Sequence, residues 1–396
     1  MSLTDTPNAN RLHITLFGRR NSGKSSLINA LTGQDIALVS NTPGTTTDLV
    51  SKAMEIQGIG PCLFIDTPGF DDEGELGELR ISRTLKAIEK TDIALLLCED
   101  TTFFHEKEIL ALLKEKNIPV IPVLNKIDIR ENSDHLATYI EEQCKIHPLL
   151  ISAKEKIGIE LIRQAILEKL PSDFGQQSIT RELVTENDLV LLVMPQDIQA
   201  PKGRLILPQV QTIRELLDKK CLVVTCTTDK FSVTLQALAR PPKLIITDSQ
   251  VFKAIYEQKP KESELTSFSV LFAGYKGDIH YYVESAAVIE RLTESSRVLI
   301  AEACTHAPLS EDIGRVKLPR LLRKWIGENL QIDMVAGTDF PQDLTPYSLV
   351  IHCGACMFNR KYVLSRIERA REQHIPMTNY GVAIAFLNGI LDQIKY

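Results

Sequence analysis

The sequence predicts an α/β protein in which mostly parallel sheets are covered by helices. Two observations support this fold class: short, uniformly apolar runs alternate with segments of helical period, and a turn follows most of the runs. Uniformly apolar runs are typical of strands that are buried on both faces of a sheet. The longest runs, residues 93–98 and 189–194, are far shorter than the roughly 20 residues that a transmembrane helix needs. The sequence therefore predicts no membrane span and no membrane partner.

The first predicted domain spans residues 1–172 and contains five strands, each followed by a turn and a helix. The strands are predicted at residues 12–17, 62–65, 93–98, 120–124 and 149–152, and helices at residues 25–31 and 159–170. The stretch from Pro171 to Gln177 is polar and contains proline and glycine, which is typical of a domain boundary.

Two smaller α/β domains are predicted at residues 173–262 and 263–396. Strands at residues 189–194, 221–226 and 243–247 enclose helices at 208–219 and 233–239, and the charged, proline-bearing residues 259–264 mark the second boundary. The last domain has strands at 297–301, 331–335 and 348–352, and helices at 286–292 and 319–328 and from Asn359 and Tyr380. Because a sheet as small as the middle one exposes its edges, we expect that domain to pair with a second copy in a homodimer.

Composition and charge exclude some partners. The 45 Lys and Arg residues against 51 Asp and Glu residues give a net charge of −6, so no overall positive field favours nucleic acid. The polar segment Met1 to Arg11 lacks the apolar core of a signal peptide, and we expect a cytoplasmic protein. Eight cysteines in that reducing compartment indicate metal ligation before disulfides.

A phosphate-binding loop follows the first predicted strand. Residues 18–26 fit the pattern G-x-x-x-x-G-K-S between a strand and a helix. Backbone N–H groups of such a loop surround the β-phosphate, the lysine bridges the β- and γ-phosphate oxygens, and the serine binds Mg²⁺. The expected nucleotide-binding residues of this loop are Asn21, Ser22, Gly23, Lys24, Ser25 and Ser26.

Three further strand ends indicate guanine specificity and Mg²⁺. Asp66 is expected to hold the metal through water, with the Gly69 amide near the γ-phosphate. The carboxylate of Asp128 can accept hydrogen bonds from two guanine donors that adenine lacks. The expected base-binding residues are Asn125, Lys126, Asp128, Ser152, Ala153 and Lys154. The predicted activity is hydrolysis of GTP to GDP and phosphate.

These motifs, over residues 11–170, resemble those of translation-factor-like GTPases. Asn21 and residues 41–48 resemble the potassium-activated group related to the tRNA-modifying GTPase MnmE. That resemblance implies that Asn21 binds K⁺, that Thr46 binds Mg²⁺, and that K⁺ replaces an arginine finger. Asn21 as an ordinary turn residue is the competing interpretation.

The group that positions the attacking water is less clear. Phe70 stands where related enzymes place a glutamine directly after Asp-x-x-Gly, and a benzyl group cannot orient water. Glu75 and Glu78 of the acidic stretch 71–78 are the carboxylates considered for this role, and a solvated acidic loop is the competing interpretation. The expected catalytic set is Lys24, Asp66, Thr46 and Glu78.

Cysteine and histidine gather after two strands of the last domain. Cys304 and His306 follow one strand, and His352, Cys353 and Cys356 follow another, at the sheet edge where α/β folds bind ligands. Zinc on three cysteines and one histidine fits this donor set, as does a 4Fe–4S cluster on three thiolates. A redox Cys-x-x-Cys pair and plain core cysteines also fit the pattern. No chemistry is expected of Cys62, Cys98, Cys144, Cys221 and Cys226.

This cysteine pattern, downstream of a potassium-type GTPase domain, resembles the HydF family of FeFe hydrogenase maturation GTPases. Residues 197–204 also resemble the dimerising segment of that family. The resemblance implies a 4Fe–4S cluster on Cys304, Cys353 and Cys356, with His306 or His352 as fourth ligand. It also implies a transient di-iron precursor, and two kinds of partner: the FeFe hydrogenase apoprotein and radical-SAM maturases.

An RNA-directed GTPase of the MnmE or ribosome-assembly kind is the main competing function. Its C-terminal cysteines would hold structural zinc. The acidic net charge and the lack of a Lys/Arg stripe count against it.

Overall fold

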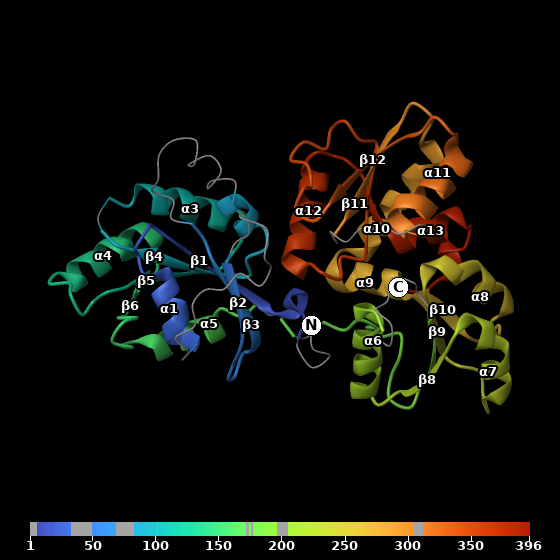
Figure 1. Cartoon of the computed structure of the whole chain (residues 1–396), viewed down its shortest axis with the longest axis horizontal. Coiled ribbons are helices and arrows are strands. Elements are labelled where there is room, and N and C mark those ends of the chain that lie inside the picture. Colours follow the sequence, from blue (N-terminus) through green and yellow to red (C-terminus); the bar gives the residue numbers. More distant parts are fainter. Residues whose placement is uncertain are drawn as a thin grey trace. The chain divides into compact units, whose positions relative to one another are not determined.

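A computed structural model describes residues 6–32, 50–68, 83–100, 102–171, 174–175, 177–195, 205–303 and 312–396. The chain forms two compact units, residues 1–176 and 177–396. Within each unit, mostly parallel strands are covered by helices (Figure 1). The predicted α/β class is confirmed. Among the described helices, none has the length and apolar character needed to cross a membrane.

The first unit contains a six-stranded sheet in the order β2-β3-β1-β4-β5-β6. Its strands are β1 (Leu12–Gly18), β2 (Val50–Ile56), β3 (Gly60–Asp66), β4 (Ile93–Cys98), β5 (Val120–Leu124) and β6 (Leu149–Leu150). All neighbours are parallel except β2, which pairs antiparallel with β3. The sequence analysis did not predict β2, because this edge strand alternates exposed and half-buried residues and has no continuous apolar run.

Helices cover both faces of this sheet. Helices α1 (Lys24–Thr32) and α5 (Ile159–Glu168) pack on one face, and α3 (Phe104–Glu115) and α4 (Ser133–Cys144) pack on the other. In α5 the buried residues Ile159, Ile162 and Ile166 recur at helical spacing, which gives the helix one apolar side. Each face therefore has its own hydrophobic core.

The second unit contains two parallel four-stranded sheets. The first has the order β10-β9-β7-β8, from β7 (Leu189–Val193), β8 (Leu222–Cys226), β9 (Leu244–Thr247) and β10 (Glu264–Ser267). The second has the order β12-β11-β13-β14, from β11 (Arg297–Glu302), β12 (Gln331–Ala336), β13 (Leu349–His352) and β14 (Met377–Asn379). The α-helices are α6 (Leu207–Asp218), α7 (Phe231–Ala237), α8 (Phe252–Gln258), α9 (Phe268–Lys276), α10 (Ile279–Ala286), α11 (Leu318–Ile326), α12 (Arg360–Glu372) and α13 (Tyr380–Leu387).

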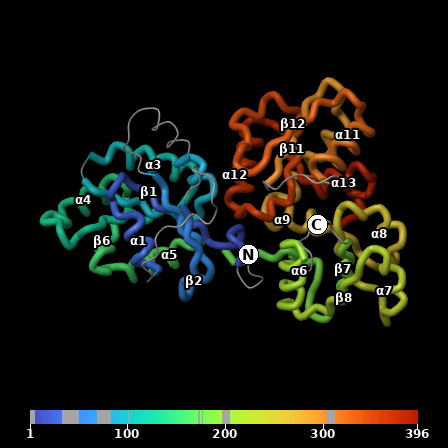
Figure 2. Tube along the Cα trace, viewed as in Figure 1, coloured from blue at the N-terminus to red at the C-terminus, as the bar shows by residue number. Residues whose placement is uncertain are grey.

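The two sheets of the second unit share one hydrophobic core. Leu191 and Ile245 of the first sheet belong to the same buried cluster as Val350 and Met377 of the second. The chain end also returns to the first sheet (Figure 2), where the Lys395 N–H donates to the carbonyl of Leu265 at 2.9 Å. The middle and last segments of the chain therefore pack as one body.

Strand β10 lies just beyond the predicted boundary between residues 262 and 263. It pairs with β9 in the first sheet, so that sheet extends to Ser267. The sequence did not indicate this strand, because in four residues it has a single strongly apolar side chain, Leu265.

Two helices that the sequence did not predict follow β10. The side chain of Ser267 accepts a hydrogen bond from the Val270 N–H and begins α9. Asp278 accepts one from the Tyr281 N–H and begins α10. The helix predicted at residues 286–292 is instead the end of α10 followed by a short 3-10 turn, Ala287–Arg291. Capping by Ser and Asp is a local signal that was present in the sequence.

Candidate functional site

The predicted nucleotide-binding residues gather at one edge of the first sheet. Strands β3, β1, β4, β5 and β6 are parallel neighbours, so their carboxyl ends meet at the same edge. The phosphate loop follows β1, Asp66 ends β3, Asn125 follows β5, and Ser152 lies two residues beyond β6. The sheet topology thus brings together motifs that are far apart in sequence.

The phosphate loop is closed around its lysine. The buried Lys24 ammonium donates to the carbonyls of Gly18 and Arg19, at 2.8 and 2.7 Å. Asn21 has a φ of 63° and is exposed, and Gly23 has a φ of 90°. Left-handed backbone at two positions turns successive N–H groups toward one side, as in other anion-binding loops. This geometry suits a phosphate ligand.

Ser25 and Asp66 form a site for a divalent cation. The Ser25 hydroxyl donates to Asp66 Oδ2 at 2.7 Å. The other oxygen, Asp66 Oδ1, is buried and has no hydrogen-bond partner among the described residues. Burial raises the pKa of Asp66, although Ser25 and Lys24 act in the opposite direction. A hydroxyl and a carboxylate with an unsatisfied oxygen match the oxygen ligands of Mg²⁺.

Asn125 links three of the motifs directly. Its Nδ2 donates to the Ser22 carbonyl at 3.1 Å, and its Oδ1 accepts from the N–H groups of Lys126 and Ala153, at 2.8 and 3.0 Å. A Cβ on Gly23 would lie 2.3 Å from Asn125 Nδ2, so the loop approaches this amide as closely as only glycine permits. Sequence analysis predicted a nucleotide-binding role for Asn125 and missed its structural one.

We expect the substitution Asn125→Ala to destabilise the first unit by about 3 kcal/mol, because three hydrogen bonds of a buried amide are lost and their partners stay buried. The measurement is the free energy of unfolding in urea. Asn132→Ala is the matched control: Asn132 is exposed, makes no capping hydrogen bond, and should change stability by less than about 0.5 kcal/mol. Equal stability of the two variants would contradict the bridging role.

The predicted base-binding residues differ in exposure. Asp128 and Lys154 are exposed, whereas Ser152 and Ala153 are buried. Lys126 Nζ forms an ion pair with Glu99 at 3.1 Å. Asp128 is therefore accessible to a ligand, while Ser152 shapes the loop: its hydroxyl accepts from the Glu155 N–H at 3.1 Å.

One ion cluster beside the phosphate loop was not predicted. Arg19 pairs with Asp100 and with the buried carboxylate of Glu106, both at 2.9 Å. Arg19 occupies a variable position of the loop motif, so the motif itself carries no signal for this contact. The cluster ties the loop to the beginning of α3.

Several predicted residues lie outside the described part of the chain. They are Thr46 with residues 41–48, Gly69, Phe70, Glu75 and Glu78, the segment 197–204, and Cys304 and His306.

The second sheet of the second unit presents the Cys-x-x-Cys pair at its carboxyl edge. β11 and β13 are parallel neighbours, with Ala301 opposite His352. The Cys353 thiol sulfur accepts hydrogen bonds from the N–H groups of Ala303 at 3.0 Å and Ala355 at 3.4 Å. The end of β11, which Cys304 follows in sequence, therefore lies against Cys353. Within the described ranges, which omit Cys304, no three His, Cys, Asp or Glu side chains form a metal-binding group.

His352 is fully buried in a hydrogen-bond network. Its Nδ1 lies 2.8 Å from the Cys353 carbonyl oxygen, and its Nε2 lies 2.9 Å from Nη1 of Arg366. Burial, with the neighbouring Arg366 charge, lowers the pKa of His352 to about 3, although the Cys353 carbonyl acts in the opposite direction. Both ring nitrogens of His352 are engaged in this network. The expectation that His306 or His352 is the fourth cluster ligand stays a prediction.

Family comparisons match three parts of the chain. Residues 13–126 match the 50S ribosome-binding GTPase family. Residues 179–277 match the hydrogen maturase F dimerization domain, and residues 280–395 match the hydrogen maturase F tetramerization domain. The two maturase domains together span more than half of the chain. The chain belongs to the hydrogen maturase F family. It carries a P-loop GTPase domain at its N-terminal end, for which GTP, GDP and Mg²⁺ are the implied ligands.

Curated relatives match the GTPase domain of this hydrogen maturase F family member. The tRNA modification GTPase MnmE of Dechloromonas aromatica is 40% identical over 159 residues, which are 39% of this chain and 34% of that protein. MnmE of Nitrosomonas europaea is 39% identical over 160 residues, which are 40% of this chain and 34% of that protein. The chain thus spans about a third of the length of these relatives.

Two solved structures are similar to part of the chain. The G domain of the FeoB iron transporter of T. maritima is 25% identical, with a TM-score of 0.33, and the match covers 40% of this chain and 98% of that one. Era of Aquifex aeolicus is 22% identical, with a TM-score of 0.35, over 54% of this chain and 92% of that one.

Proposed function

We propose that this protein is a GTP-hydrolysing scaffold that carries a 4Fe–4S cluster, and that it assembles and delivers the di-iron subcluster of FeFe hydrogenase. The observation that supports this most is that both hydrogen maturase F domains occur downstream of a GTPase domain, with Cys353 and Cys356 at the end of β13. The GTPase domain supplies a nucleotide-dependent switch. The sheet edge that carries Cys353 and Cys356 supplies the site for the cluster and the di-iron cargo.

For GTP hydrolysis, each residue has a distinct task. Lys24 turns from the loop carbonyls to the β- and γ-phosphates, and Ser25 and Asp66 hold Mg²⁺, which neutralises phosphate charge. Thr46 completes the Mg²⁺ site, Asn21 binds K⁺, and Glu78 orients the attacking water. Asp128 selects guanine.

Removal of the Lys24 ammonium tests the hydrolytic function. Lys24→Ala should lower GTP turnover at least about 100-fold, because the developing phosphate charge loses its nearest cation. Phosphate release is measured in KCl and in NaCl, and K⁺ should stimulate the wild type where Na⁺ does not. Lys114→Ala, on the exposed side of α3, is the control and should turn over normally. Unchanged turnover in Lys24→Ala would rule out this phosphate loop as the hydrolytic site.

For cluster binding, the environment of Cys353 fits a thiolate ligand. Two backbone N–H groups donate to its sulfur, and hydrogen bonds to ligand sulfurs tune iron–sulfur clusters. Cys353 and Cys356 would supply two thiolates and Cys304 the third, with His306, His352 or an exchangeable group as the fourth ligand. When bound, the cluster would supply the attachment point for the di-iron precursor, and these residues would hold it at the end of β13.

Metal analysis after anaerobic purification tests the scaffold function. The wild type should be brown, absorb broadly near about 400 nm, and contain about four irons per chain. Cys356→Ser should lose most of the iron, because one thiolate ligand is gone. Cys226→Ser, on β8 of the other sheet, should retain it. Iron retained in Cys356→Ser would contradict the assignment.

The RNA-directed GTPase is the second candidate function, favoured by the 40% identity of the GTPase domain to MnmE. It predicts colourless protein with one structural zinc per chain on the same cysteines. The metal analysis therefore separates the two candidates. The proposed partners of the scaffold are a second copy, the FeFe hydrogenase apoprotein and the radical-SAM maturases. We propose no nucleic-acid partner.

A further inference from the structure

A cavity of about 470 Å³ in the second unit is lined by three arginines. We call it the arginine pocket: Arg181, Arg360 and Arg371 with Asp278, Ile279 and Leu364. Asp278 is the one carboxylate among its described lining residues. It already pairs with Arg371 at 2.5 Å and accepts from the Tyr281 N–H at 3.1 Å. None of its described lining residues belongs to the phosphate loop or to the Cys353 and Cys356 pair.

The backbone that carries Arg181 is firmly anchored. The Glu215 carboxylate accepts hydrogen bonds from the Ser178 hydroxyl, from the Ile179 N–H, and from both the N–H and the hydroxyl of Thr180. Lys219 Nζ donates to the Arg181 carbonyl at 2.5 Å. The position of Arg181 at the pocket is therefore determined by the fold rather than by its own side chain.

Two features of Arg181 oppose this placement, its backbone conformation and its burial beside Arg360. Its φ is 46°, a left-handed conformation that is unfavourable for a non-glycine residue. Its guanidinium lies against the backbone of Gly274, where an added Cβ would be 1.6 Å from Nη2. Burial lowers the pKa of Arg181 and the neighbouring Arg360 lowers it further, although the Asp278 carboxylate acts in the opposite direction. Among the described residues, the Arg181 side chain makes no hydrogen bond and no ion pair that offsets these costs.

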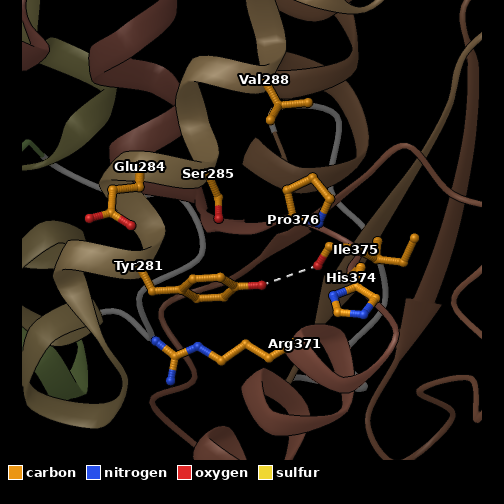
Figure 3. Close-up of a pocket in the computed structure, with 8 residues that line it drawn as sticks. All are labelled: Tyr281, Glu284, Ser285, Val288, Arg371, His374, Ile375 and Pro376. Atoms are coloured by element: carbon orange, nitrogen blue, oxygen red, sulfur yellow. Dashed lines mark hydrogen bonds between the residues drawn. The ribbon is translucent and has the colours of Figure 1, made fainter.

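The other two arginines are held in place. Arg360 Nη1 donates to the carbonyls of Tyr275 and Gly277, at 3.4 and 3.1 Å. The Arg371 guanidinium carbon lies 4.4 Å from the Tyr281 ring centroid, so the guanidinium stacks on that ring. Figure 3 shows both side chains in a second pocket, which Arg371 also lines. The charges that face the cavity are thus preorganised, which lowers the entropy cost of binding a ligand.

We propose that the arginine pocket binds a small ligand through an oxyanion, a phosphate or carboxylate group, held between Arg181 and Arg360. Planar guanidinium groups match both anions with paired N–H donors. An oxyanion would supply the partner that Arg181 lacks and would relieve its repulsion with Arg360. The apolar side chains of Ile279 and Leu364 bound the cavity and leave room for the carbon part of a small molecule.

Calorimetric titration of the full chain with inorganic phosphate and, separately, with succinate tests this proposal and distinguishes the two anions. We expect one of them, or both, to bind the arginine pocket once per chain, and Arg181→Met to weaken the binding to the pocket at least about 10-fold. The control Arg214→Met removes an exposed arginine of α6 in the same unit and should bind like the wild type. Because phosphate also fits the phosphate loop, only the difference between these two variants is assigned to the pocket. Absence of such a difference with both anions would overturn the proposal.

A second variant separates ligand binding from a structural role. Arg181→Asn keeps a residue that tolerates a positive φ and removes the repulsion with Arg360. Without added anion it should raise the midpoint of thermal unfolding above that of the wild type. The anion should then stabilise the wild type and leave Arg181→Asn unchanged. A lower midpoint without anion, or equal stabilisation of both proteins by the anion, would show that Arg181 serves the fold alone.

Discussion

Asp128→Asn should lower the affinity for GTP by about 1,000-fold and raise the affinity for xanthosine triphosphate. A carboxylate accepts from the N1–H and the 2-amino group of guanine, whereas the amide offers one acceptor and one donor. Its NH₂ would face the guanine amino group, and mismatched buried donors are expensive. Xanthine carries a carbonyl at that position, which accepts from the amide. The Asp128 side chain is exposed and therefore accessible to either base.

The measurement is equilibrium titration with a fluorescent guanosine triphosphate and, separately, with a fluorescent xanthosine triphosphate. Asp134→Asn, in the exposed first turn of α4, is the matched control and should bind GTP normally. Normal GTP affinity in Asp128→Asn would show that another group selects the base. A loss of all nucleotides alike would point to a damaged fold instead.

The second large effect concerns a buried arginine that contacts His352, the residue before Cys353. Arg366 is 1% exposed and donates to His352 Nε2 at 2.9 Å, to the Gly337 carbonyl at 2.6 Å and to the Tyr362 hydroxyl at 3.3 Å. The ring centroids of Phe340, Phe358 and Tyr362 lie 4.6–4.7 Å from its guanidinium carbon. In the described part of the chain no carboxylate pairs with it. The aromatic faces and three acceptors therefore offset the cost of burying its charge.

Arg366→Ala should destabilise the second unit by about 3–5 kcal/mol. The truncation leaves a cavity between the rings and three buried acceptors without donors. Urea unfolding measures this loss. Arg320→Ala, at an exposed position of α11, should stay within about 0.5 kcal/mol of the wild type. The stability of Arg366→Lys should lie between those of the wild type and Arg366→Ala, because an ammonium keeps the charge but cannot reach all three acceptors. A loss below about 1 kcal/mol in Arg366→Ala would contradict this account.

The gathering of the predicted nucleotide-binding motifs at one sheet edge was predictable because their signals are local. Each motif follows an apolar strand, and a parallel sheet places all such strand ends at one edge. Lys24, Ser25 and Asp66 therefore lie together as expected. The edge strand β2 and the short strand β10 were missed for the opposite reason: their stability comes from pairing with a neighbour, and their own residues carry little pattern.

The sequence by itself determined the α/β class and the phosphate loop, and it indicated three cysteines as candidate metal ligands. Only the tertiary structure decided how side chains from distant segments combine. The two nitrogens of His352 are engaged because α12 brings Arg366 beneath β13. Arg181 lies on Gly274 because Glu215 anchors its backbone. Periodicity and motifs report what one segment does within a few residues, whereas charge, burial and hydrogen bonding depend on neighbours that packing alone supplies.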